Sequence, residues 1–131
     1  MKLILLLFLF PLLGFTQTQI GNDIDGKGAH DYSGSSIYIS ADGSTVAIGA
    51  PGKEQTNFEP GYVHIYKKIS GSWTQIGSNI NGVGIDDYFG SSVSLSADGS
   101  TIAIGAPGVD LNGVESGQVL IYKTLRILGL K

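Results

Sequence analysis

Residues 35–52 read SSIYISADGSTVAIGAPG, and the order of residue types in this stretch decides the fold. The first third alternates small polar and apolar residues, a period of two that places Ile37 and Ile39 on one face of a strand. The dipeptide Asp-Gly then separates it from a second apolar run, which is a strong hairpin signal. The sequence therefore predicts antiparallel strands at 35–40 and 45–49. The second ends before a proline, because proline cannot donate to a strand ladder.

The stretch returns 56 residues later, where residues 91–108 read SSVSLSADGSTIAIGAPG. The whole segment 18–67 aligns with 74–123 without a gap, so the chain contains two copies of one unit. Each copy continues through a polar loop to a third predicted strand, and the first copy adds a fourth at 72–76. Helical periodicity is absent from the sequence. Because four short antiparallel strands make one propeller blade, we expect an all-β fold of about two propeller-type blades, an incomplete propeller.

Phe-Gly at 89–90 followed by Gly-Ala-Pro at 105–107 is similar to the FG-GAP repeat. In the first unit Ser-Gly at 33–34 replaces Phe-Gly, whereas Gly-Ala-Pro at 49–51 is kept. The resemblance covers residues 18–123. It implies blades like those of the integrin alpha-chain β-propeller and of many secreted bacterial proteins. By this likeness we expect a non-enzymatic scaffold or cell-adhesion module with a protein or glycan ligand.

The first sixteen residues, MKLILLLFLFPLLGFT, have the pattern of a signal peptide: a positive start, a short apolar run and small residues near the cleavage point. The run is shorter than the roughly 20 residues of a spanning helix, so we expect no transmembrane segment after cleavage. The chain is thus predicted to be secreted, extracellular or at the cell surface. The expected organisation is a signal peptide at 1–16, an entering strand and loop at 17–33, one blade at 34–77, a second blade with a missing or atypical fourth strand at 78–123, and a divergent tail at 124–131.

The composition excludes several function classes. The 131 residues include 8 Lys and Arg against 11 Asp and Glu, which argues against a nucleic-acid partner. The absence of cysteine excludes disulfides, thiolate metal sites and a cysteine nucleophile. His30 and His64, the only histidines, do not return in the second unit and have no visible nucleophile constellation. We therefore predict no catalytic residues and no enzyme. A fragment of a secreted hydrolase is the enzymatic alternative.

A calcium-binding propeller module is the other alternative. Asp110, Asn112 and Glu115 space oxygen ligands around a glycine, as calcium loops do, and form the candidate metal site. Calcium-bearing FG-GAP blades carry several aspartates in the first hairpin, but here Asp42 and Asp98 are the only hairpin carboxylates. Calcium takes about six to eight oxygens, so we interpret these two as turn residues before glycine. No cofactor is predicted otherwise.

The number of blades poses a problem. A propeller closes about four to eight blades, and repeat proteins generally need about three units. Two blades would leave a strand face with Ile37 and Ile39, or Val93 and Leu95, partly exposed, and such open sheets invite pairing. We expect either a fragment of a longer repeat protein or self-association through the open blade edges.

Overall fold

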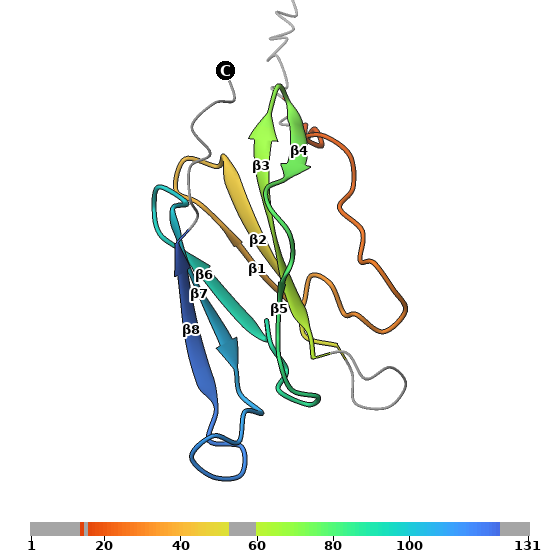
Figure 1. The fold of residues 1–131 in the computed structure, drawn as a ribbon. Coiled ribbons are helices and arrows are strands. Elements are labelled where there is room, and N and C mark those ends of the chain that lie inside the picture. The colour runs from red at the N-terminus through yellow and green to blue at the C-terminus, as the bar shows by residue number, and fades with distance from the viewer. Residues whose placement is uncertain (1–13, 15, 53–59, 124–131) are drawn as a thin grey trace, which may run out of the picture.

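The computed structural model describes residues 14, 16–52 and 60–123, and these form eight β-strands and no helix (Figure 1). All pairings between strands are antiparallel. The first sheet has the order β1-β2-β3-β4, with β5 also pairing with β3, and the second has the order β6-β7-β8. This confirms the predicted all-β, blade-like architecture. The strands are β1 (Ser36–Ile39), β2 (Thr45–Ala50), β3 (Tyr62–Ile69), β4 (Ser72–Gln75), β5 (Ile80–Asn81), β6 (Ser92–Leu95), β7 (Thr101–Ala106) and β8 (Gln118–Lys123).

The first hairpin of each sheet closes in the way that Ala-Asp-Gly-Ser predicts. Gly43 and Gly99 both have φ 68°, a left-handed conformation that glycine adopts without steric cost. The Ser40 N–H donates to the Thr45 carbonyl at 2.8 Å, and the same bond recurs 56 residues later at 2.9 Å. The two copies of the sequence therefore fold into two copies of the same local structure.

The alternation along the strands gives each sheet two distinct faces. Residues directly opposite each other in an antiparallel ladder share a face. We call face I the side that carries Ile37 and Ile39 in the first sheet, and face II the side that carries Val63 and Ile65. The equivalent residues of the second sheet are Val93 and Leu95 on face I, and Val119 and Ile121 on face II.

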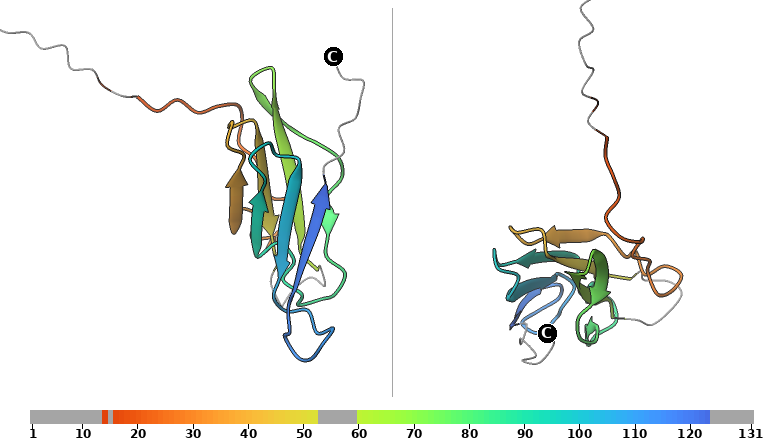
Figure 2. Two further views of the ribbon diagram at one scale, coloured as in Figure 1. Left: turned by 90° about the vertical axis from the view of Figure 1, so that its left-hand side faces the viewer. Right: turned by 90° about the horizontal axis from the view of Figure 1, so that it is seen from above.

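The two sheets stack as layers, with β6 lying against β1 and β2 (Figure 2). Face II of the first sheet meets face I of the second, so the stacking is head to tail. Phe89 of the Phe-Gly pair is inserted between the layers and is 2% exposed. The core consists of Ala47, Val63, Ile65, Phe89, Leu95, Ile102, Ile104, Ala106 and Val109.

One predicted element is wrong. The entering strand within 17–33 was expected at 18–21, but these residues belong to no strand. A strand needs a partner ladder; as the counterpart of β4, this segment would pair with the third strand of another blade, and none of the described strands pairs with it. The segment runs past β4 instead, where a Cβ on Gly21 would stand 3.3 Å from Cδ1 of Trp73.

The other predicted segments are either present in the structure or lie outside the described residues. The predicted fourth strand of the first blade is present as β4, whereas β5 was not predicted. The predicted signal peptide lies almost entirely outside the described residues, and the predicted tail at 124–131 lies entirely outside them. Within the part of the chain that is described, no helix is long and apolar enough to cross a membrane.

Candidate functional site

The hairpin aspartates are structural residues of their turns. Asp42 accepts hydrogen bonds from Ser40 Oγ at 2.6 Å, Ser44 N at 3.0 Å and Ser44 Oγ at 2.8 Å. Asp98 accepts the equivalent bonds from Ser96 Oγ and Ser100 N. These bonds, the serine hydroxyl first, lower the pKa of each carboxyl to about 2. The interpretation of both as turn residues agrees with this geometry.

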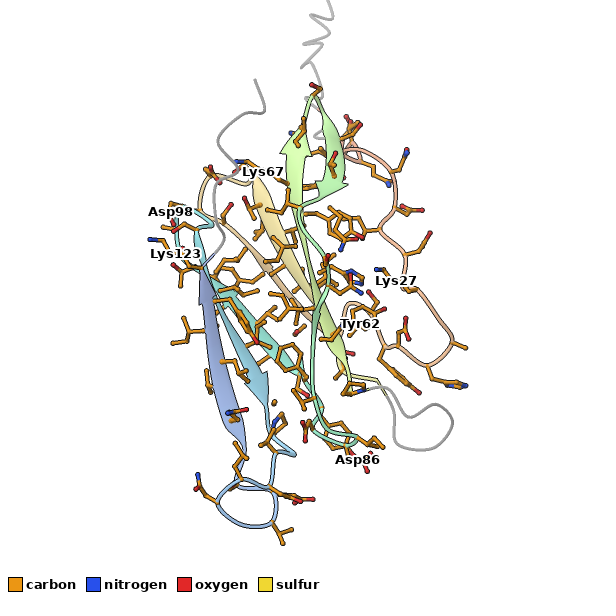
Figure 3. All side chains as sticks on the ribbon, in the orientation of Figure 1. Lys27, Tyr62, Lys67, Asp86, Asp98 and Lys123 are labelled. Atoms are coloured by element: carbon orange, nitrogen blue, oxygen red, sulfur yellow. The ribbon has the colours of Figure 1, made fainter. Side chains whose placement is uncertain are left out.

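A second pair of aspartates holds the loops that lead into the two sheets. Asp31 is nearly buried, and its Oδ2 accepts from Lys27 N at 2.9 Å, from Gly28 N at 2.6 Å and from the Tyr62 hydroxyl. Asp87, its equivalent, accepts from the backbone N–H of residue 84 at 2.7 Å. Figure 3 shows Lys27 and Tyr62 on the same side of the first sheet. These carboxylates fix loop shape through backbone donors.

The candidate calcium ligands lie in the loop between β7 and β8. Asp110 Oδ1 accepts from Glu115 N at 2.6 Å, so this carboxylate closes its own loop. Asn112 contributes its backbone N–H to Ser116 Oγ at 3.3 Å. The side chains of all three candidates are exposed. No group of three or more His, Asp or Glu residues that could hold a metal ion occurs among the described residues.

His64 lies in a different environment from the one a catalytic base needs. It is fully buried on face I, its Nδ1 lies 3.1 Å from Asn79 Oδ1, and its Nε2 has no hydrogen-bond partner. The Tyr62 ring packs edge-on against it at 4.5 Å between centroids. Burial, and then the charge of Lys27, lowers the pKa of His64, so the ring is neutral near pH 7. The leucine at the equivalent position, Leu120, was the sequence signal for this apolar place.

His30, the other histidine, lies on the surface and not in the core. It is exposed in a left-handed backbone conformation, with φ 67°, and its ring is 6.5 Å from that of Tyr32. The structure therefore places the two histidines in unrelated settings, one on an exposed loop and one in the core.

Exposed apolar residues gather in loops at the end of the sheets opposite the Asp-Gly hairpins, and sequence reasoning missed them. Val83 and Val114 are 96% and 88% exposed, and Ile85 and Leu111 lie in the same two loops. The two loops touch, because the Gly108 N–H donates to the Asp87 carbonyl at 3.2 Å. Figure 3 shows Asp86 at this end and Asp98 at the other. We call Val83, Ile85, Leu111 and Val114 the loop-end surface.

Two stacked antiparallel sheets, formed by two copies of one sequence unit, define a repeat protein built from propeller-type β blades. Residues 82–122 match the sequence model of the FG-GAP repeat family. The match spans β6, β7 and β8 with the Phe-Gly and Gly-Ala-Pro motifs, and it confirms the predicted resemblance. The first sheet carries the same residues in register, although the match itself covers the second unit. A search of curated proteins finds no significant match to the chain.

Proposed function

We propose that this protein is an exported, non-enzymatic FG-GAP-type module that binds a protein partner through its loop-end surface, in an adhesion or scaffold role. The observation that carries the proposal is the exposure of Val83 and Val114 on loops whose backbone is held by hydrogen bonds. Exposed apolar side chains on preorganised loops favour binding, because little conformational entropy is lost on association. The stacked sheets then serve as the rigid support.

The polar groups support a binding role over catalysis. Asp31, Asp42, Asp98 and Asp110 all accept backbone N–H groups of their own loops. His64 is sealed in the core, and its one hydrogen-bonded nitrogen faces an amide instead of a carboxylate. A nucleophile, a base and a group that orients the base are not brought together among the described residues. The signal-peptide pattern and the FG-GAP match support export.

The test is the binding of fluorescently labelled protein to intact cells of the producing culture. We expect saturable binding that falls at least tenfold in the double variant Val83→Asp, Val114→Asp. The control variant Ile69→Asp introduces the same charge at a half-exposed site on the opposite end of β3, and it should bind like the wild type.

Two treatments of the cells identify the ligand class. Protease treatment should abolish the binding, and periodate oxidation of glycans should spare it. Binding that survives protease and is lost with periodate would replace the protein ligand with a glycan. Binding that does not saturate, or that is unchanged in the double variant, would contradict the proposal.

A further inference from the structure

Apolar side chains stay open to solvent on two opposite faces of the described sheets, at β1 on face I of the first sheet and at β8 on face II of the second. Elsewhere on face I of the first sheet, Val46 and Ile48 of β2 are only 8% and 7% exposed. Face I of the first sheet exposes Ile37 and Ile39 by 62% and 52%. Face II of the second sheet exposes Val119 and Ile121 by 68% and 71%. Large aliphatic side chains standing side by side on a strand mark an interaction surface. Each exposed pair is therefore a candidate interaction surface.

The molecule already contains the interface that would cover both faces. Between the stacked sheets, face II of the first sheet meets face I of the second. There Val63 and Ile65, the equivalents of Val119 and Ile121, are 0% and 6% exposed. Leu95, the equivalent of Ile39, is likewise buried. Ile39 on face I and Val119 and Ile121 on face II are thus uncovered, whereas their equivalents between the two sheets are covered.

The backbone contacts of the inner interface are also repeated in the sequence. Ser36 Oγ donates to the Gly90 carbonyl at 2.7 Å, and the Ala41 N–H donates to the Ala97 carbonyl at 3.1 Å. A Cβ on Gly49 would stand 2.0 Å from the Gly90 oxygen, so the two backbones touch.

The outer faces carry the same groups without these contacts. Ser92 and Gly105 on the second sheet are the equivalents of Ser36 and Gly49, and Gly34 before the first sheet is the equivalent of Gly90. A Cβ on Gly34 would meet nothing within 4 Å. The serine and glycine groups of the inner interface are therefore repeated at both outer faces, where the β1 side of face I and the β8 side of face II are uncovered.

We propose that copies of this chain assemble head to tail, with face II of the second sheet of one copy docking on face I of the first sheet of the next copy. The contact is heterologous, because each copy contributes a different surface, and such contacts form rings when the rotation closes. With two blades in each copy, a propeller of about four to eight blades corresponds to about two to four copies.

The segment before the first sheet fits the same arrangement. Residues 16–20 are exposed and belong to no strand. In the first blade β3 pairs with β4, Tyr66 opposite Gln75. Tyr122 is the equivalent of Tyr66, and Gln19 is the equivalent of Gln75. The same register therefore pairs Tyr122 of β8 with Gln19 of the next copy. The next copy then supplies the fourth strand of the preceding second blade by strand addition.

The experiment measures molar mass by light scattering after size exclusion of the full chain, expressed with its N-terminal segment. We expect a wild-type assembly of several copies. Ile37→Asp disables face I and Ile121→Asp disables face II, and each variant alone should be a monomer. An equal mixture should give a dimer and nothing larger, because only one pair of intact faces remains. Ile69→Asp, on neither open face, should assemble like the wild type.

The mixing experiment distinguishes a head-to-tail contact from an interface between two like faces. An interface of like faces would leave one single variant assembled and would give no rescue on mixing. A monomeric wild type, an Ile37→Asp variant that still assembles, or a mixture that stays monomeric would each overturn the proposal. Circular dichroism of the two variants verifies that each retains the β-sheet spectrum of the wild type.

A second measurement uses the absence of cysteine from the chain. By the inner contact, residue 97 of one copy should lie beside residue 41 of the next. An oxidised mixture of Ala41→Cys and Ala97→Cys chains should give a disulfide-linked dimer, and either variant alone should not. The double variant is the positive control, because its two cysteines lie together within one chain. Dimers from a single variant, or no dimer from the mixture, would contradict the proposed register.

Discussion

Asp42 and Asp98 occupy the same place in the two Asp-Gly hairpins, and both carboxylates accept hydrogen bonds from flanking serines. Their pKa of about 2 lies below the ordinary value of 3.8. The folded state therefore gains stability from their ionised form. That contribution is complete above about pH 5 and is lost as the pH falls through 4 toward 2.

We expect the double variant Asp42→Asn, Asp98→Asn to melt below the wild type at pH 6, with a difference that shrinks as the pH falls below about 4. Asparagine preserves the turn, since Asn-Gly also favours this hairpin. Thermal melts from pH 7 to pH 2 measure the effect. A difference that stays constant over this range would contradict the assigned hydrogen bonds.

His64 makes the opposite kind of contribution to the core. Its Nε2 is buried without a partner, which costs about 1–3 kcal/mol in a folded protein. Because its folded pKa is lowered from 6.5, its neutral form is the one that stabilises the fold. Burying the neutral ring therefore costs more as the pH falls below about 6.5, so the free energy of unfolding declines there, whereas it does not change through this group above about pH 7.

We expect His64→Leu to raise the free energy of unfolding by about 1 kcal/mol at pH 7 and to flatten its pH dependence between 7 and 5. Leucine is the residue at the equivalent position 120. Asn79 keeps Lys27 Nζ and Gln75 Nε2 as donors, so the substitution leaves its oxygen satisfied. Urea titrations at several pH values measure both effects. Loss of stability at every pH would show that the histidine stabilises the core.

At the scale of elements, the strands with alternating residues and an Asp-Gly turn could be predicted from the sequence. The hairpins β1–β2 and β6–β7 follow from local chemistry, which a sequence displays directly. The entering strand at 18–21 was wrong because strand formation depends on a partner edge. The two-residue β5 was missed because it exists through its pairing with β3.

The candidate site was less predictable for the same reason. The aspartate roles follow from local turn chemistry and could be anticipated. The loop-end surface depends on two loops that are joined by the backbone hydrogen bond between Gly108 and Asp87, and no local pattern encodes that contact. The burial of His64 likewise depends on tertiary contacts. The only sequence signal for it is the apolar residue at the equivalent position, Leu120.

Gly49 and Gly105 give a matched test of the layer packing. A Cβ on Gly49 would stand 2.0 Å from the Gly90 carbonyl of the other sheet, whereas one on Gly105 would clash only with the Ser92 hydroxyl, which can rotate. We expect Gly49→Ala to cost about 2–3 kcal/mol and Gly105→Ala less than about 1 kcal/mol, by chemical denaturation of assembly-deficient Ile37→Asp protein. Equal costs would mean that the sheets do not approach at Gly49.

At the scale of the whole molecule, stability comes from two sheets stacked by apolar contact, with local hydrogen bonds in the loops. Asp110 closes its loop by binding a backbone N–H. We therefore expect millimolar calcium, compared with a chelator, to change the melting temperature by less than about 1 °C. A large rise that Asp110→Asn and Glu115→Gln abolish would instead establish the calcium loop.

The head-to-tail order of the layers is the claim on which the assembly proposal depends. Methyl NOE spectroscopy of the Ile37→Asp protein, a monomer by our proposal, tests it most directly. We expect NOEs from Val63 and Ile65 to the methyl groups of Leu95, Ile102 and Ile104, which share their buried cluster. The methyl groups of Val119 and Ile121 should show no NOE to the first sheet. The reverse pattern, with Val119 and Ile121 contacting the first sheet and Val63 free of the second, would contradict the account.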